Sequence, residues 1–223
     1  SCMYFVTIVF TRWNEDHFER HSRPVFNSFV ELLRNRNLMS LFGSIFFLSV
    51  GTAAGTQYIG PYIGHRGLPE LFFATFWLVG VGVEIVLTYN LQKVVRIWGL
   101  KGTFLIALAS EYIRWTGMSM LAAPGWMLFL NALQGPAVIG VFFASAMYLD
   151  AECEESVRSS AQAMIYFAFM TGQVTGYLIS SALVEFHADL PRADAIQTTF
   201  FWSGFFILTA LLIGTLFVKR ESA

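Results

Sequence analysis

The sequence predicts an all-α membrane protein, built as a bundle of six transmembrane helices. Of its 223 residues, 56% are hydrophobic and only 13% are charged, and the uncharged residues gather in long runs. Soluble domains carry about a quarter charged residues, whereas a helix that crosses a bilayer needs about 20 mostly apolar residues. The segment 200–208 does not alternate apolar and polar residues as the strands of a membrane barrel do. The runs are therefore predicted to be helices.

The six helices follow from the uncharged runs and from the turn signals between them. Residues 115–149 carry no charge but are too long for one crossing. Pro124-Gly125 divides this stretch, because proline lacks a backbone donor and fixes φ. The expected spans are residues 37–59, 69–91, 102–122, 125–149, 159–184 and 197–218.

Lysine and arginine are distributed unevenly between the two sides of the predicted bundle. One side carries Arg12, Arg20, Arg23, Arg34, Arg36, Lys93, Arg96, Lys101, Arg158, Lys219 and Arg220. The other side carries Arg66 and Arg192. Because cytoplasmic loops carry the excess of basic residues, both ends of the chain are expected in the cytoplasm, with residues 219–223 as a cytoplasmic tail.

Residues 1–36 precede the first complete span. Residues 1–10 are apolar but too few to cross a bilayer, and we expect them to be the end of a preceding transmembrane helix whose start is absent. Residues 11–36 are mixed in charge and are expected to form a cytoplasmic connector. Phe26, Phe29, Val30 and Leu33 have helical spacing, which indicates a short interfacial helix.

Several classes of function find no support in the sequence. The net charge of −1 gives no basic excess to hold nucleic acid. Cys2 and Cys153 provide neither a disulfide framework nor zinc-ligand spacing. His17 and His21 stand four residues apart, but no third metal ligand is evident, so a solvated loop is preferred. The sequence also lacks the HExxH, GxGxxG, CxxC and GxSxG motifs, which argues against an enzyme, and no cofactor is implied.

Three charged residues fall within the predicted spans, where charges are costly and usually functional. Glu84 follows the small residues Gly80 and Gly82 and is interpreted as a proton acceptor or a ligand for a solute hydroxyl; the alternative is a structural hydrogen bond to a neighbouring helix. Glu111 and Arg114 share one helix face, and a self-neutralised pair is the favoured interpretation of Glu111. Arg114 lies near a helix end, from which its side chain could extend to water.

Uncharged polar and small residues add further candidates. Gln57 and Gln134 are interpreted as candidate solute ligands, although amides also hold transmembrane helices together. Small residues four apart, which allow close helix approach, are Gly51 and Gly55 and, further along the chain, Gly172, Gly176 and Ser180. Packing is the preferred interpretation of both sets.

Two loop motifs carry a resemblance to a known family. The segment Arg96-Ile97-Trp98-Gly99-Leu100-Lys101 is similar to the short basic turn of the major facilitator superfamily. An acidic residue, Asp150, precedes an R-x-S-A-Q run at residues 158–162, which resembles the bacterial nucleoside:proton symporter family. Glu84 stands fifteen residues before Gly99, where that family carries a functional glutamate. The resemblance covers nearly all of residues 25–220 and corresponds to the C-terminal six-helix half of such a transporter.

The resemblance implies a secondary active transporter of the plasma (inner) membrane. It implies proton-coupled uptake of a nucleoside or similar polar solute by alternating access, between this half and an N-terminal six-helix half that is missing from the sequence. The candidate solute- and proton-binding residues of such a transporter are Glu84, Gln57, Gln134 and Arg114. The implied cytoplasmic gate consists of Arg96, Asp150, Arg158 and Gln162.

The sequence departs from the family pattern at two positions. Ile139 stands where family members carry an aspartate, and Val81 stands where they carry a glutamine. Two alternatives therefore stay open: a superfamily member for another solute, such as a sugar, an organic acid or a drug, and a non-transporting membrane sensor of the same fold.

Overall fold

The computed structural model describes residues 32–217, and these residues form helices without a strand. The predicted helix end at residues 1–10, most of the connector with His17 and His21, and the tail lie outside the described residues. The helices are α3 (Arg36–His65), α4 (Glu70–Tyr89), α5 (Leu91–Met120), α6 (Pro124–Asn131), α7 (Gln134–Val138), the π-helix η2 (Ile139–Ala144), α8 (Ser145–Glu152), α9 (Glu155–Phe186) and α10 (Arg192–Phe217).

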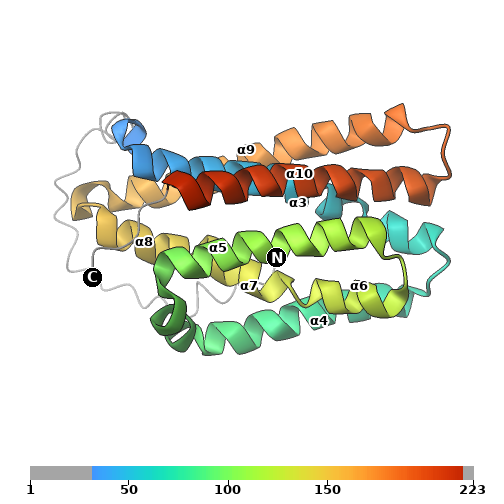
Figure 1. Ribbon diagram of the computed structural model, residues 1–223, viewed down its shortest axis with the longest axis horizontal. Coiled ribbons are helices and arrows are strands. Elements are labelled where there is room, and N and C mark those ends of the chain that lie inside the picture. Colours follow the sequence, from blue (N-terminus) through green and yellow to red (C-terminus); the bar gives the residue numbers. More distant parts are fainter. Residues whose placement is uncertain (1–31, 218–223) are drawn as a thin grey trace, which may run out of the picture.

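These helices form a bundle of long, roughly parallel rods whose direction alternates along the chain (Figure 1). The elements from α6 to α8 together make one crossing, so the described residues cross the bundle as the six predicted helices do. By length and composition, five of these crossings are apolar enough to span a membrane. The exception is α5, in which Lys101, Glu111 and Arg114 interrupt the apolar residues. The prediction of an all-α membrane bundle is confirmed.

The two ends of the bundle differ in charge. The basic end holds the start of α3, the α4–α5 junction, the α8–α9 turn and the end of α10. Lys93, Arg96, Lys101 and Arg158 all lie there. The opposite end holds the turns after α3, α5 and α9, where Arg66 and Arg192 lie. Loops rich in Lys and Arg therefore alternate along the chain with loops that are poor in them, as the sequence predicted.

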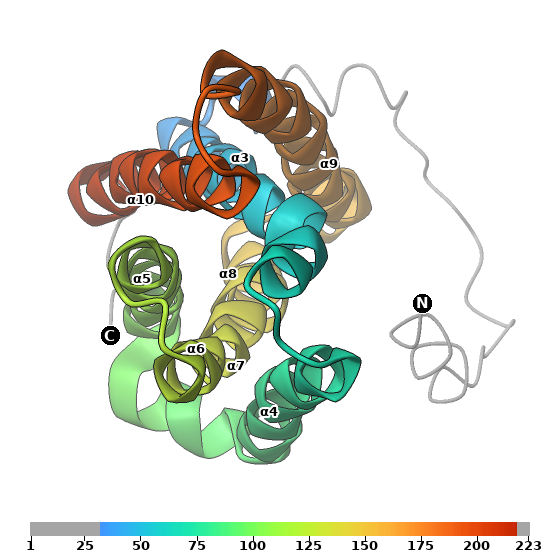
Figure 2. The same cartoon turned by 90° about the vertical axis from the view of Figure 1, so that its right-hand side faces the viewer.

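The start of α5 differs from the prediction. The sequence predicted a short basic turn followed by a helix from residue 102, but residues 91–98 are helical and cross from α4 to α5 at the basic end (Figure 2). The chain then turns sharply at Gly99, where φ is 68° and ψ is 171°. Only glycine adopts this conformation without a steric penalty. We name residues 91–98 the crossing segment.

The fourth crossing is broken where the sequence predicted a continuous helix over 125–149. Helix α6 ends at Asn131 and α7 begins at Gln134. Pro136 then removes one backbone donor, and the π-helix η2 adds one residue to the turn. The Ser145 hydroxyl donates to the Val141 carbonyl at the end of η2. Breaks of this kind are tolerated in a membrane where neighbouring helices bury them.

Helix α3 is the central helix of one side of the bundle and packs closely through glycines. Gly172 and Gly176 of α9 lie directly against the backbone of α3, at Phe46 and Val50. Gly55 faces the ring of Trp115 on α5. Because a side chain at these positions would collide with its neighbour, the predicted packing role of the small residues is confirmed.

Arg66 joins three helices at the opposite end. Its Nη2 donates to Asp194 of α10 over 3.3 Å and also to the Gln197 side chain. Gln197 in turn donates to the Ser119 carbonyl of α5 over 2.8 Å. The ends of α3, α5 and α10 are thereby held together.

We expect Gly55→Ala to destabilise the bundle, because its Cβ would enter the space of the Trp115 ring. Overpacking of this kind costs about 1–3 kcal/mol. The measurement is the free energy of unfolding in detergent. Gly43→Ala is the matched control on the same helix, since nothing lies within 4 Å of the added Cβ; it should be neutral or slightly stabilising. Equal effects of the two substitutions would contradict the close packing.

Candidate functional site

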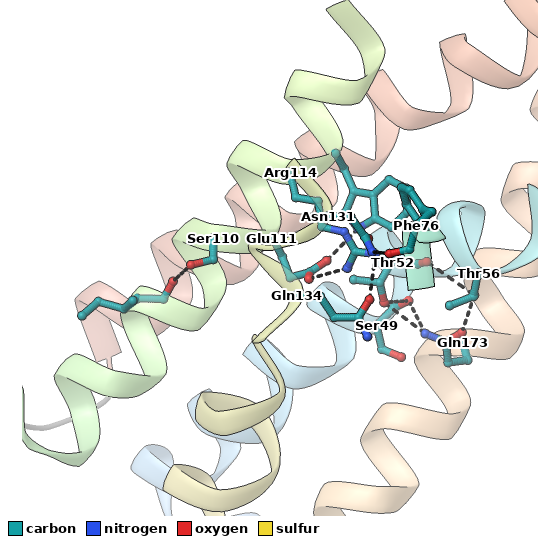
Figure 3. Close-up of polar contacts among 12 residues, drawn as sticks. Ser49, Thr52, Thr56, Phe76, Ser110, Glu111, Arg114, Asn131, Gln134 and Gln173 are labelled. Atoms are coloured by element: carbon teal, nitrogen blue, oxygen red, sulfur yellow. Dashed lines mark hydrogen bonds and ion pairs between the residues drawn. The ribbon is translucent and has the colours of Figure 1, made fainter. Parts of the chain in front are cut away.

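A charged cluster lies in the interior of the bundle, centred on Arg114 of α5 (Figure 3). The Arg114 side chain donates from Nη1 to Glu111 Oε1 over 2.8 Å. From Nη2 it donates to Asn131 Oδ1 over 2.6 Å and to Gln134 Oε1 over 3.1 Å. Arg114 and Glu111 are only 5% and 3% exposed. The sequence prediction that they share a helix face is confirmed, and the pair neutralises its own charge.

Two further side chains complete the charged cluster. Trp115 Nε1 donates to the second oxygen of Glu111 over 2.7 Å, and the Arg114 guanidinium lies 4.6 Å from the centre of the Trp115 ring. Asn131 Nδ2 donates to the Phe76 carbonyl of α4 over 2.5 Å. Gly80 lies against Asn131 and Gln134, where a larger residue would collide. The cluster therefore joins α4, α5, α6 and α7.

The burial of Arg114 settles one of the sequence expectations. Its side chain does not extend to water from the helix end, so that expectation is wrong; it is turned into the bundle by three hydrogen-bond acceptors. Asn131 ends α6 and Gln134 begins α7, so the guanidinium holds both sides of the helix break. The sequence analysis missed Trp115, although its spacing of four residues from Glu111 was a signal that the two share a helix face. The role of the Phe76 carbonyl had no such signal, because its partner Asn131 lies on another helix.

An uncharged cluster links α3 to α9. Gln173 of α9 donates to the Ser49 carbonyl over 3.2 Å and to the Thr52 hydroxyl over 3.1 Å. The Thr56 hydroxyl donates to Gln173 Oε1 over 3.3 Å (Figure 3). The Ser49 hydroxyl donates to the Phe169 carbonyl over 2.5 Å. These bonds and the adjacent glycines hold the two helices at a short distance.

Polar side chains of the same two helices continue onto the surface of the bundle. Gln57 donates from Nε2 to Ser181 Oγ over 3.1 Å, and Gln57 Oε1 accepts from the Ser180 hydroxyl over 3.0 Å. The Tyr58 hydroxyl donates to Ser181 over 3.3 Å. Gln57 and Ser181 are exposed. We call Thr56, Gln57, Tyr58, Tyr177 and Ser181 the α3–α9 polar face.

Glu84 stands apart from both clusters. Its side chain is half-buried on α4, and within residues 32–217 it forms neither a hydrogen bond nor an ion pair. Gly135 of α7 lies against the backbone of Glu84, and Gly80, one helical turn away, faces the charged cluster. Glu84 is therefore close to the helix break without being neutralised by Arg114.

Three of the four predicted gate residues meet at the basic end. Arg158 Nε lies 3.3 Å from Asp150 Oδ1, and its Nη2 donates to the Asp150 carbonyl over 3.1 Å. Gln162 donates to Asp150 Oδ1 over 3.3 Å. Arg96 is exposed on the crossing segment and is not part of this contact. These bonds brace the turn between α8 and α9.

The α8–α9 turn also contains a cysteine. Burial raises the pKa of the Cys153 thiol above its usual value, and the nearby Glu152 carboxylate adds to the shift. The thiol therefore stays protonated at neutral pH. No group of three metal-ligating side chains occurs among residues 32–217.

The chain was compared with known proteins. A model of the MFS_1 like family matches residues 1–190, which include α3 to α9. No curated protein matches the chain. The family match covers the charged cluster, the α3–α9 polar face and Glu84.

We expect Arg114→Met to destabilise the bundle by about 3–5 kcal/mol, because it leaves the buried Glu111 carboxylate without a cation. The double variant Glu111→Gln with Arg114→Met should lose less, since it removes that charge as well and an amide still accepts from Trp115. Unfolding of the two variants in detergent, followed by tryptophan fluorescence, measures the difference. If the double variant were the less stable of the two, the pair would not be self-neutralising.

Proposed function

The chain belongs to the MFS_1 like family, and on that basis we propose that it is one half of a secondary transporter that moves a small polar solute by alternating access. A family of this kind points to a transporter rather than to an enzyme. In such proteins the solute lies between two helical halves near the bilayer midplane, and the halves rock about it. The second half is a further set of six helices that belongs to the same protein.

The α3–α9 polar face is the observation that carries this proposal. Exposed amides and hydroxyls on membrane-spanning helices are unfavourable against hydrocarbon, because lipid tails offer no hydrogen bonds. On the α3–α9 polar face the exposed side chains of this kind include Thr56, Gln57 and Ser181. A water-filled path that contains the solute satisfies them. This face is therefore the side of the bundle that borders the path.

The solute is an uncharged, nucleoside-like molecule with several hydroxyls. The Arg114 and Glu111 charges neutralise one another in the interior, which leaves amide and hydroxyl groups for the solute. Gln57 uses one of its two amide protons on Ser181, and the other is available to a solute oxygen. Gln134, half-buried beside Arg114, extends the polar groups toward α4.

Glu84 couples transport to a proton. A carboxyl group within a membrane span that has no cationic partner can hold a proton in one state and release it to water in another. Glu84 meets this description within the described residues. Its position against Gly135 places it beside the α6–α7 break, so a change of its charge acts at this break.

A non-transporting sensor of the same fold is the second candidate. It is favoured by Ile139, which is 1% exposed in η2 and offers no acid at the position where the resembling family has one. Val81 is 40% exposed and offers no amide. A sensor would bind the solute on the same polar face without accumulating it, so uptake measurements separate the two functions.

We expect Glu84→Gln to abolish the accumulation of solute driven by a pH gradient, because an amide cannot exchange a proton. Uptake of radiolabelled uridine into vesicles that contain the complete protein, with and without an imposed gradient, measures the effect. Glu70→Gln at the start of the same helix is the matched control and should retain accumulation. Unchanged accumulation by Glu84→Gln would remove its coupling role.

We expect Gln57→Ala to weaken solute affinity by about tenfold while leaving the maximal rate nearly unchanged, because it removes one hydrogen bond made before and during transport. Thr209→Ala is the control, since that hydroxyl donates to the carbonyl of Phe205 on its own helix. The concentration dependence of uptake separates the two parameters. An affinity equal to that of the unsubstituted protein would exclude Gln57 from the solute path.

A further inference from the structure

The crossing segment at the basic end has the character of an interfacial helix. It runs across the bundle between α4 and α5 instead of along it (Figure 2). Ile97 and Trp98 are 64% and 49% exposed, and Lys93 and Arg96 are exposed as well. A short helix that combines exposed apolar and basic residues lies in the plane of the membrane surface, with apolar side chains in the hydrocarbon and cations at headgroup level.

An apolar groove opens beneath this segment. The groove has a volume of about 50 Å³ and is lined by residues of α4, the crossing segment, α5 and the broken crossing: Leu87, Val94, Trp98, Ile106, Pro136 and Ile139. Thr103 also borders it, but its hydroxyl donates to the Gly99 carbonyl over 2.7 Å and is not available to an occupant. From Gly99 to Ile106 the helix rises by about 10 Å, so the groove extends from the membrane surface into the hydrocarbon layer.

Two exposed cations of the crossing segment, Lys93 and Arg96, have no counterion among the residues that the structure describes. Lys93 and Arg96 are three residues apart on one helix face, and among residues 32–217 neither forms a hydrogen bond or an ion pair. The sequence contains no acidic residue between Glu84 and Glu111. This part of the surface is therefore positively charged, and its complement is an anion.

We propose that the groove and the Lys93–Arg96 pair form a binding site for an anionic diacyl phospholipid. The charge of the pair matches the phosphate, and the apolar walls of the groove match the first few methylene groups of one acyl chain. Val94 and Trp98 line the groove and Lys93 and Arg96 do not. At 3.6 residues per turn the two cations fall on another side of the same helix, so one short segment can contact both parts of the lipid. The site does not depend on the transport function.

The test measures which phospholipid stays bound to the complete protein. The protein is purified in detergent with equal amounts of phosphatidylglycerol and phosphatidylcholine, and the bound lipid is determined by native mass spectrometry. The unsubstituted protein should retain phosphatidylglycerol preferentially. Lys93→Gln and Arg96→Gln should each reduce that preference about fivefold, the contribution of one cation near an anionic membrane surface. Arg192→Gln, an exposed cation at the opposite end, is the matched control and should keep it.

A groove variant tests the acyl-chain part separately. Val94→Phe fills the groove and should lower retention of both lipids, whereas inorganic phosphate at millimolar concentration should not displace phosphatidylglycerol, because it has no chain. Lys93 and Arg96 are exposed and form no hydrogen bond or ion pair with the described residues, so their variants should unfold at nearly the same temperature as the unsubstituted protein. Equal retention of the two lipids by the unsubstituted protein, an undiminished preference in the double Lys93→Gln, Arg96→Gln variant, or displacement by phosphate alone would each overturn the proposal.

Discussion

The buried pair of Arg114 and Glu111 is the interaction on which the arrangement of half of the bundle depends. An isolated charge in this environment is costly, and a pair is tolerated only when further hydrogen bonds satisfy it. Asn131, Gln134 and Trp115 supply those bonds. Asn131 and Gln134 flank the break between α6 and α7. Their hydrogen bonds to Arg114 therefore also fix the position of the break. Asn131 then holds α4 through the Phe76 carbonyl.

The other half of the bundle is held together differently. Along their length α3 meets α9 and α10 through glycines, so backbone atoms approach closely and van der Waals contacts hold the helices together. The Arg66–Asp194 ion pair adds to this only at the end of α3. The Gln173 hydrogen bonds add to this contact without introducing a charge. The difference matters for function, because the charged cluster uses most of its polar atoms internally whereas the α3–α9 polar face leaves several on the surface. A solute path along α3 and α9 is consistent with both facts.

The basic residues at one end of the bundle have separate tasks. Arg158 is paired with Asp150 and braces a turn. An exposed pair of this kind contributes at most about 1 kcal/mol, so it can open during a conformational change. Lys101 donates to the Thr215 carbonyl near the end of α10. Lys93 and Arg96 are turned to the surface, which leaves them for the membrane. The excess of Lys and Arg in cytoplasmic loops predicts the orientation of the chain. It does not distinguish the different roles of these residues.

The sequence by itself determined the class of the fold, the alternation of the loops, the shared face of Glu111 and Arg114 and the close packing of the glycines. Each of these depends on hydropathy or on spacing within one helix, which the order of residues contains. Only the tertiary structure decided that Arg114 is buried, that its partners lie 17 and 20 residues further along the chain, and that Arg96 lies away from Asp150. It also decided the break after Asn131, and that residues 91–98 are helical before the turn at Gly99. Spacing gives the face on which a side chain lies, but the rotation of one helix against the next follows from packing among distant residues.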